Sequence, residues 1–371
     1  MVIDPDGSLV DACGRLRHFG RRAFEQLAAD LDRCFVCGTA RTVVDFNDEH
    51  VIPDWILRRF NLHSRRITLP NGQPQLYGRY TLRCCTSCNA LLGTRLETPV
   101  SQLFEDNVGA PVENLKASDP TLLYSWLCLV FIKLHLKDRE FRADPDRRNP
   151  SVQIGDIHDW DGLHHVHSVA RTPHSGASVE PSVPGTTCFF EMADAPESFD
   201  FVSLSDYSTL TLRIGNLGIA TVLNDCGYVG ALVREYFSHI SGPISSIQLR
   251  EIAARLAYGN TLLVTRPTFW SELEPGGNLT IRSSPPMSHE LNDVDRTDLG
   301  RLMAYACAPL LRKSRTPDVE LKIEQLARGE IQFLYHDGGS FISEPLQPLS
   351  VAQPCDAPDR QPPVSPPVAG G

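Results

Sequence analysis

The sequence predicts a protein of the α+β class, in which helices and strands occupy separate stretches of the chain. Apolar residues recur at helical spacing in residues 121–138, 246–257 and 296–313. Residues 186–235 hold short runs rich in β-branched and aromatic residues, which are typical of strands. Residues 34–100 are dense in cysteine, arginine and turn residues. That composition indicates a small domain organised around something other than a large apolar core.

These patterns divide the chain into four segments. The segments are an N-terminal helix in 1–33, a small domain in 34–110, a larger mixed helical and β-rich region in 111–344, and a Pro-rich tail in 345–371. The first helix is expected over 8–33, because Leu16, Phe24 and Leu31 recur at roughly helical spacing. The tail holds eight prolines and is expected to be disordered.

Turn residues and composition predict further elements of the larger region. Residues 141–185 are rich in Asp, Arg, Pro, His and Ser, and we expect a long loop there. A Gly215-Asn216 turn between two apolar runs predicts a hairpin. A short helix is expected at 318–328, and the run IQFLYHD (331–337) is a candidate last strand.

Charge is distributed unevenly along the chain. The formal net charge of −10 by itself argues against a nucleic-acid partner. Residues 41–96, however, contain eight arginines and four acidic residues, which gives a net charge of +4. The small domain is therefore locally basic. The composition also excludes a collagen, a coiled-coil rod and a small disulfide scaffold.

The chain shows no sign of membrane insertion or secretion. Its most apolar run, Leu122–Ile132, is far shorter than the roughly 20 residues that a bilayer requires. The eleven cysteines are an odd number with uneven placement, which favours a metal site over a disulfide framework. We therefore expect a cytoplasmic protein with reduced thiols and no membrane partner.

Two CxxC pairs carry the clearest chemical signal. Cys34 and Cys37 form the first pair, and Cys85 and Cys88 form the second. Each pair can place two thiolates on a tight turn, and two such turns complete the tetrahedral shell of a structural zinc ion. Cys84 competes with Cys85, although its spacing to Cys88 fits the turn less well. The alternative to a zinc site is a redox pair or a set of scattered core cysteines, but a redox CxxC needs no second pair.

Between the two pairs lies the stretch NDEHVIPDW (47–55), in which Glu49 and His50 precede two β-branched residues and a proline. The combined pattern CxxC…EHVIP…CxxCN resembles the zinc-stapled HNH endonucleases, which have the ββα-metal or His-Me finger fold. The resemblance covers residues 34–97 and is closest to the branch in which asparagine follows the last zinc cysteine. It implies a ββα-metal domain that hydrolyses phosphodiester bonds of nucleic acid, with DNA as the expected substrate.

The resemblance also implies a role for each motif residue. Cys34, Cys37, Cys85 and Cys88 would bind the structural zinc. His50 would be the general base that takes a proton from water. Glu49 and Asn89 would bind a catalytic divalent cation, and their oxygen atoms suit Mg²⁺ or Mn²⁺. The products would be 5′-phosphate and 3′-hydroxyl ends.

The chain departs from the family pattern in the residues that support the general base. The Asn or His that usually precedes the second CxxC is not evident, and Asn61, His63 and Asn71 are the candidates to replace it. Glu97, two helical turns after Asn89, is either an extra metal ligand or a solvated helix carboxylate. The departures leave a second hypothesis open, in which a zinc-stapled module binds nucleic acid or protein without catalysis.

Two further groups of residues could serve a function or could have none. Six arginines are candidates for phosphate contacts, the alternative being a solvated basic surface: Arg58, Arg59, Arg65, Arg66, Arg83 and Arg95. Five histidines gather between His158 and His174, and His165 and His167 would share one side of a strand. No carboxylate or cysteine pattern completes a metal site there, so loop histidines without a ligand role are favoured.

The acidic region after the small domain is a poor surface for DNA. A protein or a small ligand is the expected partner of residues 111–344. By analogy of architecture alone, a small nuclease joined to an unfamiliar region suggests a bacterial or phage-related nuclease of host defence or of a mobile element.

Overall fold

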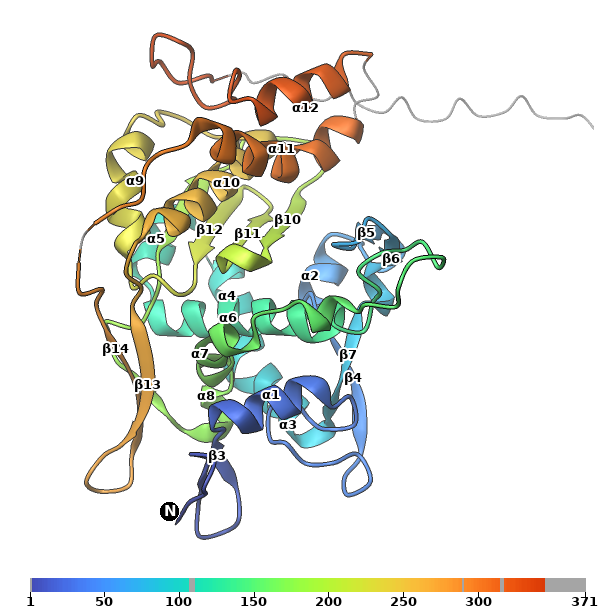
Figure 1. Cartoon of the computed structure of the whole chain (residues 1–371), viewed down its shortest axis with the longest axis vertical. Coiled ribbons are helices and arrows are strands. Elements are labelled where there is room, and N and C mark those ends of the chain that lie inside the picture. The colour runs from blue at the N-terminus through green and yellow to red at the C-terminus, as the bar shows by residue number, and fades with distance from the viewer. Residues whose placement is uncertain (1, 107–110, 289, 314–316, 344–371) are drawn as a thin grey trace, which may run out of the picture.

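The computed structural model describes residues 2–106, 111–288, 290–313 and 317–343, and it confirms the α+β class (Figure 1). The Pro-rich tail predicted at 345–371 lies outside the described residues, as do the last four residues of the segment 34–110.

The described strands form five sheets. One sheet is three-stranded and antiparallel, with β1 (Val2–Ile3), β2 (Leu9–Val10) and β3 (Leu16–His18). Two are two-stranded, β4 (Phe46–His50) with β7 (Thr81–Cys85), and β5 (Arg66–Thr68) with β6 (Pro74–Leu76). The four-stranded sheet has the order β10 (Phe199–Leu204), β11 (Thr209–Ile214), β12 (Leu217–Val222) and β9 (Thr187–Glu191). The last combines the hairpin β13 (Thr268–Leu273) and β14 (Leu279–Ser284) with β8 (Ser178–Val179).

Helices cover these sheets and connect them. The helices of the first half are α1 (Arg21–Ala29), α2 (Asp54–Arg59), α3 (Thr86–Leu92), α4 (Thr98–Asp106), α5 (Pro111–Ala117), α6 (Pro120–Asp138), α7 (Trp160–Ala170) and α8 (Thr172–Ser175). A π-helical turn, η2 (Gly93–Glu97), joins α3 to α4, and 3₁₀ turns lie at η1 (Tyr77–Arg79), η3 (Ile154–Asp156) and η4 (Ser205–Tyr207). The second half holds α9 (Tyr228–Ser238), α10 (Ser246–Leu262), α11 (Arg296–Lys313) and α12 (Val319–Ala327).

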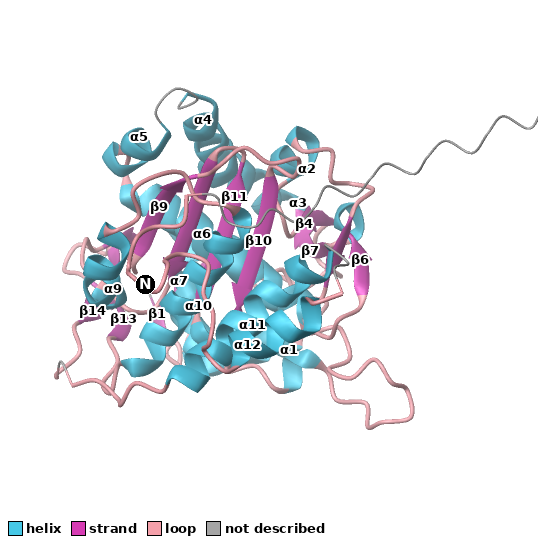
Figure 2. Ribbon diagram, turned by 90° about the horizontal axis from the view of Figure 1, so that it is seen from above, coloured by secondary structure: helices cyan, strands magenta, loops and turns pink. Residues whose placement is uncertain are grey.

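The four-stranded sheet is buried on both faces, and helices form layers above and below it. In β11, Leu210 and Leu212 belong to the same apolar cluster as α6, while Ala220 and Val222 of β12 pack with α10. Figure 1 shows the layers from top to bottom: α12 and α11, then α10, the sheet, α6, and finally α7 with α1 and α3. Figure 2 shows that the β4–β7 ribbon lies beyond β10, at the opposite end from the β13–β14 hairpin.

Helix α6 is the centre of the molecule. Asp119 caps its first turn by accepting a hydrogen bond from the backbone N–H of Thr121, and Pro120 occupies the first helical position. Because the helix is apolar on all sides, it is buried on nearly all sides. One apolar cluster includes Leu82 of β7, Phe131 of α6 and Leu212 of β11, so the small domain and the larger region share a core. Among the described helices, none has the length and apolar character needed to cross a membrane.

The helix predicted over 8–33 is wrong in its first half. Residues up to His18 form the short strands β1 to β3, and the helix begins only at Arg21. Gly14 adopts a φ of +78° in the turn between β2 and β3, a conformation that glycine tolerates and that ends helical backbone. A side chain at Gly20 would also overlap the carbonyl oxygen of Asp6, so the turn between β1 and β2 packs directly against the start of α1.

The long loop predicted over 141–185 is also wrong, because it contains α7 and α8. Asp159 caps α7 by accepting a hydrogen bond from the backbone N–H of Gly162, and α7 buries two of the histidines of this segment. His165 and His167 therefore lie on a helix and not on a strand. Both are buried, and their ring nitrogens bond the hydroxyl of Tyr124 and the carbonyl oxygen of Phe35. The segment was misread because these polar residues face the core.

Other local predictions are confirmed. The apolar helix, the two helices further along the chain, and the hairpin turn at Gly215-Asn216 all occur where the sequence indicates. The short helix α12 ends before Gly329, whose φ is +69°. The run 331–337 does not form a strand; it makes one isolated bridge, between Tyr335 and Phe341.

Candidate functional site

Strands β4 and β7 and helix α3 pack together as one unit, although α2, β5 and β6 lie between the two strands in sequence. The strands are antiparallel, so that Phe46 lies opposite Cys85 and His50 lies opposite Thr81. Helix α3 begins at the residue after β7 ends. Pro53 occupies the position before α2 and turns the chain away from the ribbon just after His50. Two paired strands and the helix that follows the second strand thus make up what is called the ββα unit below.

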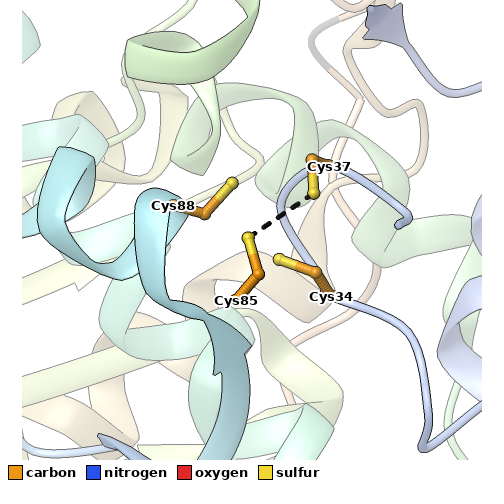
Figure 3. A group of neighbouring side chains, drawn as sticks. All are labelled: Cys34, Cys37, Cys85 and Cys88. Atoms are coloured by element: carbon orange, nitrogen blue, oxygen red, sulfur yellow. Dashed lines mark hydrogen bonds between the residues drawn. The ribbon is translucent and has the colours of Figure 1, made fainter. Parts of the chain in front are cut away.

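The four predicted zinc cysteines converge at one end of this unit (Figure 3). Cys34 and Cys37 lie on a turn that the backbone N–H of Gly38 closes by donating to the carbonyl oxygen of Cys34. Cys85 ends β7, and Cys88 lies in the first turn of α3. Each sulfur lies within 4.8 Å of the other three. Two tight turns 47 residues apart in sequence are thereby joined at one point.

The sulfur spacing suits a zinc ion. The sulfurs of Cys37 and Cys85 are 3.7 Å apart. A tetrahedron with zinc–sulfur bonds of about 2.3 Å has sulfur–sulfur edges of about 3.8 Å. Cys84 lies 3.7 Å from the sulfur of Cys34 but is not a member of the four-cysteine group, which contains Cys85. These four thiols can therefore hold a structural zinc ion.

A buried arginine from α7's C-terminal end lies beside the cysteines. Arg171 donates to the carbonyl oxygens of Val36 and Leu16, both at 2.8 Å. Burial lowers its pKa to about 9, and the thiol groups of Cys37 and Cys88 oppose this shift. The guanidinium is thus charged at neutral pH and offsets part of the negative charge of a thiolate cluster. The sequence interpretation missed this residue, because it placed Arg171 in a loop.

Glu49 is buried and bonded to a lysine from the central helix. Its side chain is 8% exposed, and its Oε1 accepts a hydrogen bond of 2.7 Å from Lys133 Nζ. The same ammonium donates to Glu97 Oε1 at 2.9 Å and to the carbonyl oxygen of His50 at 2.8 Å. Burial raises the pKa of Glu97, and Lys133 opposes that shift. Glu97 is therefore not the solvated helix carboxylate that one interpretation of the sequence favoured.

Asn89 lies on the same face of β4 as Glu49, but it does not bond Lys133. Its amide nitrogen donates to Asn47 Oδ1 at 2.9 Å. Asn47 precedes Glu49 by two positions, and side chains two apart on a strand share one face. Among the described residues, no hydrogen bond joins Asn89 to Glu49 directly. The two predicted cation ligands, Glu49 and Asn89, thus lie on the same face of β4. Each has a side-chain oxygen that these hydrogen bonds do not use.

His50 ends β4 and lies beside Asp54 and His63. Its Nδ1 is 3.9 Å from Asp54 Oδ1, and the Nε2–H of His63 donates to that same oxygen at 2.9 Å. The two imidazole rings are 5.8 Å apart and perpendicular. Arg58 forms an ion pair with the other carboxylate oxygen of Asp54. The three ligand atoms of His50, Asp54 and His63 all lie within 4.8 Å of one another.

The charges of this cluster follow from its surroundings. Burial lowers the pKa of His50, and the carboxylate of Asp54 only partly offsets this effect. Burial alone would raise the pKa of Asp54, but the hydrogen bond from His63 and the charge of Arg58 outweigh it and lower that pKa. Near pH 7 the cluster therefore presents a neutral imidazole at His50 next to an ionised carboxylate.

Comparison with known proteins gives no relative. No family model, curated protein or solved structure matches this chain. The likeness to HNH endonucleases accordingly depends on the motif residues and on their arrangement around β4, β7 and α3.

All six arginines predicted to contact phosphates are exposed: Arg58, Arg59, Arg65, Arg66, Arg83 and Arg95. Arg83 lies opposite Asp48 on the solvent-facing side of the β4–β7 ribbon. Arg83 lies on β7 within the ββα unit, and the other five lie on α2, on β5 or the residue before it, and on η2. Phosphate contact by any of them stays a prediction.

Of the three candidates to support His50, only His63 is part of its cluster. Asn71 instead donates its amide to the carbonyl oxygen of Arg142 at 2.8 Å, and Asn61 is an exposed residue with a φ of +52°. Sequence reasoning missed Asp54, although it stands four residues after His50, at the first position of α2. Its acidic side chain directly after a proline was the available signal.

Proposed function

We propose that this chain is a divalent-cation-dependent endonuclease of the HNH type, which hydrolyses phosphodiester bonds of nucleic acid, with DNA as the expected substrate. The observation that carries the proposal is the ββα unit with four cysteines at one end and His50 at the end of its first strand. A zinc ion at Cys34, Cys37, Cys85 and Cys88 would be structural, because four protein ligands leave no open position for a substrate.

In this proposal His50 is the general base. Its neutral imidazole accepts a proton from a water molecule, and the water oxygen forms a new bond to phosphorus while the bond to the 3′ oxygen breaks. Asp54, close to Nδ1, stabilises the imidazolium that results. The products carry 5′-phosphate and 3′-hydroxyl ends.

We assign a catalytic Mg²⁺ or Mn²⁺ to Glu49 and Asn89. The donor chemistry fits, since both residues offer oxygen atoms and a second carboxylate, that of Glu97, lies beside Glu49. Bound there, the cation would stabilise the charge that develops on the phosphate and on the leaving oxygen. The exposed arginines would hold the backbone phosphates on either side, independently of base sequence.

One observation favours a second candidate function, a zinc-stapled binding module without catalysis. The ammonium of Lys133 already bonds Glu49 Oε1, and it repels a divalent cation at the same carboxylate. If Lys133 excludes that cation, the ββα unit would bind nucleic acid or protein without cleaving it.

We further propose a cytoplasmic location for the protein and a regulatory or recognition role for residues 111–344. All ten described cysteines are free, as expected in a reducing compartment. Because the acidic residues lie mostly outside the small domain, a protein or a small ligand is the partner that we propose for the larger region.

Plasmid nicking with Mg²⁺ or Mn²⁺ tests the nuclease proposal. The wild type should nick DNA, and His50→Ala should lose activity by at least a hundredfold, the usual contribution of a general base. Asn89→Ala should lose activity without disturbing the buried charges. His336→Ala is the matched control, since His336 is exposed and belongs to no element of the proposed site. Nicking activity that survives in His50→Ala, or a wild type that binds DNA but never cleaves it, would contradict the proposal.

A further inference from the structure

The cluster of His50, Asp54 and His63 has the composition of a metal site that is separate from the two discussed above. Two imidazoles and one carboxylate form a nitrogen and oxygen ligand set that suits borderline transition metals such as Zn²⁺ and Co²⁺. Mg²⁺ prefers oxygen ligands and is a poor match for this set. The cluster therefore differs in chemistry from both the four cysteines and the pair of Glu49 and Asn89.

The geometry is also suitable. A small displacement of the side chains brings three ligand atoms around one ion, because the distances between neighbouring atoms are 2.9 and 3.9 Å. Ligand atoms around a four-coordinate ion with bonds of about 2.0–2.1 Å lie about 3.3 Å apart. Arg58 occupies Asp54 Oδ2 and leaves Oδ1 directed at both imidazoles.

The cluster can be reached from solvent. The side chain of His63 is 46% exposed, while those of His50 and Asp54 are 27% and 29% exposed. An ion can thus enter without opening the core, and three protein ligands leave a coordination position for water. Asp54 and His50 are held on rigid elements, the first turn of α2 and the end of β4, which favours a preformed site.

We propose that His50, Asp54 and His63 bind one divalent transition-metal ion, and that this ion inhibits the chain by occupying the general base. The inhibitory half depends on the proposed nuclease function, whereas the binding half does not. A neutral imidazole that donates the lone pair of Nδ1 to a metal carries its proton on Nε2. Metal-bound His50 consequently has no lone pair left to accept a proton from water.

Calorimetric titration with Zn²⁺ tests the binding half. The protein should first be loaded to one zinc per chain at the cysteines, then titrated with Zn²⁺ and, in a parallel arm, with Mg²⁺. We expect one additional Zn²⁺ per chain and no comparable binding of Mg²⁺. His63→Ala and Asp54→Asn should each weaken the second Zn²⁺ by on the order of tenfold or more, and His336→Ala should bind like the wild type. Circular dichroism confirms that each variant is folded.

Plasmid nicking in Mg²⁺ with and without added Zn²⁺ tests the inhibitory half. Each variant is compared with its own zinc-free rate, so that a changed basal rate does not enter the result. Zn²⁺ should slow the wild type and His336→Ala, and the degree of inhibition should fall in His63→Ala. A wild type that takes up no second Zn²⁺, or unchanged Zn²⁺ affinity in both His63→Ala and Asp54→Asn, overturns the site. Binding without inhibition overturns the inhibitory role, and a wild type that never nicks overturns the nuclease function while the calorimetry still decides the site.

Discussion

Lys133 and Glu49 join the central helix to the motif strand through a fully buried ion pair. The ammonium is 0% exposed and lies 2.7 Å from the carboxylate, although 84 residues separate the two in sequence. Glu97 completes the group from the π-helical turn after α3. The position of Glu49, and with it the end of β4, therefore depends on a residue outside the HNH-like motif.

Replacing this lysine should strongly destabilise the protein. Lys133→Met leaves Glu49 and Glu97 buried without a cation, and such a change typically lowers the free energy of unfolding by about 3–5 kcal/mol. Lys137→Met is the matched control, because Lys137 lies one helical turn away and pairs with Glu140 near the surface. Its pair should contribute no more than about 1 kcal/mol. Urea unfolding of the three proteins measures the difference, and equal losses in the two variants would contradict the role of the buried pair.

The cysteine cluster predicts a specific pattern of zinc content. The wild type and Cys84→Ala should each carry one zinc per chain, because Cys84 is not a member of the four-cysteine group. Cys85→Ser should lose the metal, and residues 34–97 should open locally, since zinc binding contributes on the order of 10 kcal/mol in small zinc domains. Elemental analysis gives the zinc content, and hydrogen exchange reports the opening. Loss of zinc in Cys84→Ala together with retention in Cys85→Ser would reverse the assignment of the ligand.

The elements with strong local signals could be predicted from the sequence. The apolar run of α6, the glycine turn between β11 and β12, and the two CxxC spacings are each encoded within a few residues. The four cysteines could be assigned for the same reason, because the zinc-binding turn is a local feature of the backbone.

The features that were missed depend on contacts between distant parts of the chain. The sequence of α7 resembles that of a polar loop. In the fold, however, its histidines form hydrogen bonds with α6 and with the loop that carries Cys37. The partner of Glu49 lies in an apolar run, where a lone lysine gives no hint of its bond. Arg171 similarly reaches the cysteine turn from 135 residues away. Periodicity describes one element at a time and cannot reveal which buried polar groups meet.

Two buried histidines should make stability depend on pH. His135 and His165 are 3% and 7% exposed, and burial lowers the pKa of each from 6.5 to about 3. Above pH 6.5 the folded and unfolded states are both neutral at these positions. Below it the unfolded chain binds protons that the folded chain does not, so the free energy of unfolding falls as the pH decreases from 6.5 toward 3.

A substitution separates the contribution of one histidine from that of the other groups that titrate in this pH range. Between pH 7 and pH 5.5, each histidine should lower the free energy of unfolding by about 1 kcal/mol. His135→Phe keeps the aromatic contact with Phe131 and cannot titrate. Urea unfolding at the two pH values should show a decrease that is smaller by about 1 kcal/mol in this variant. An unchanged pH dependence would mean that His135 takes up its proton in the folded state.

Nucleic-acid binding should depend on salt through the exposed arginines. If Arg83 contacts a phosphate, its replacement should weaken binding by a similar factor for every sequence and reduce the slope of log K against log salt by about 0.9. Arg83→Gln is compared with Arg234→Gln, since Arg234 is also exposed but lies on α9, away from the ββα unit. Fluorescence anisotropy with duplexes of two unrelated sequences, without divalent cations, measures both slopes. The same loss in both variants would indicate only a change of net charge, and an unchanged slope in Arg83→Gln would remove the β4–β7 ribbon from the binding surface.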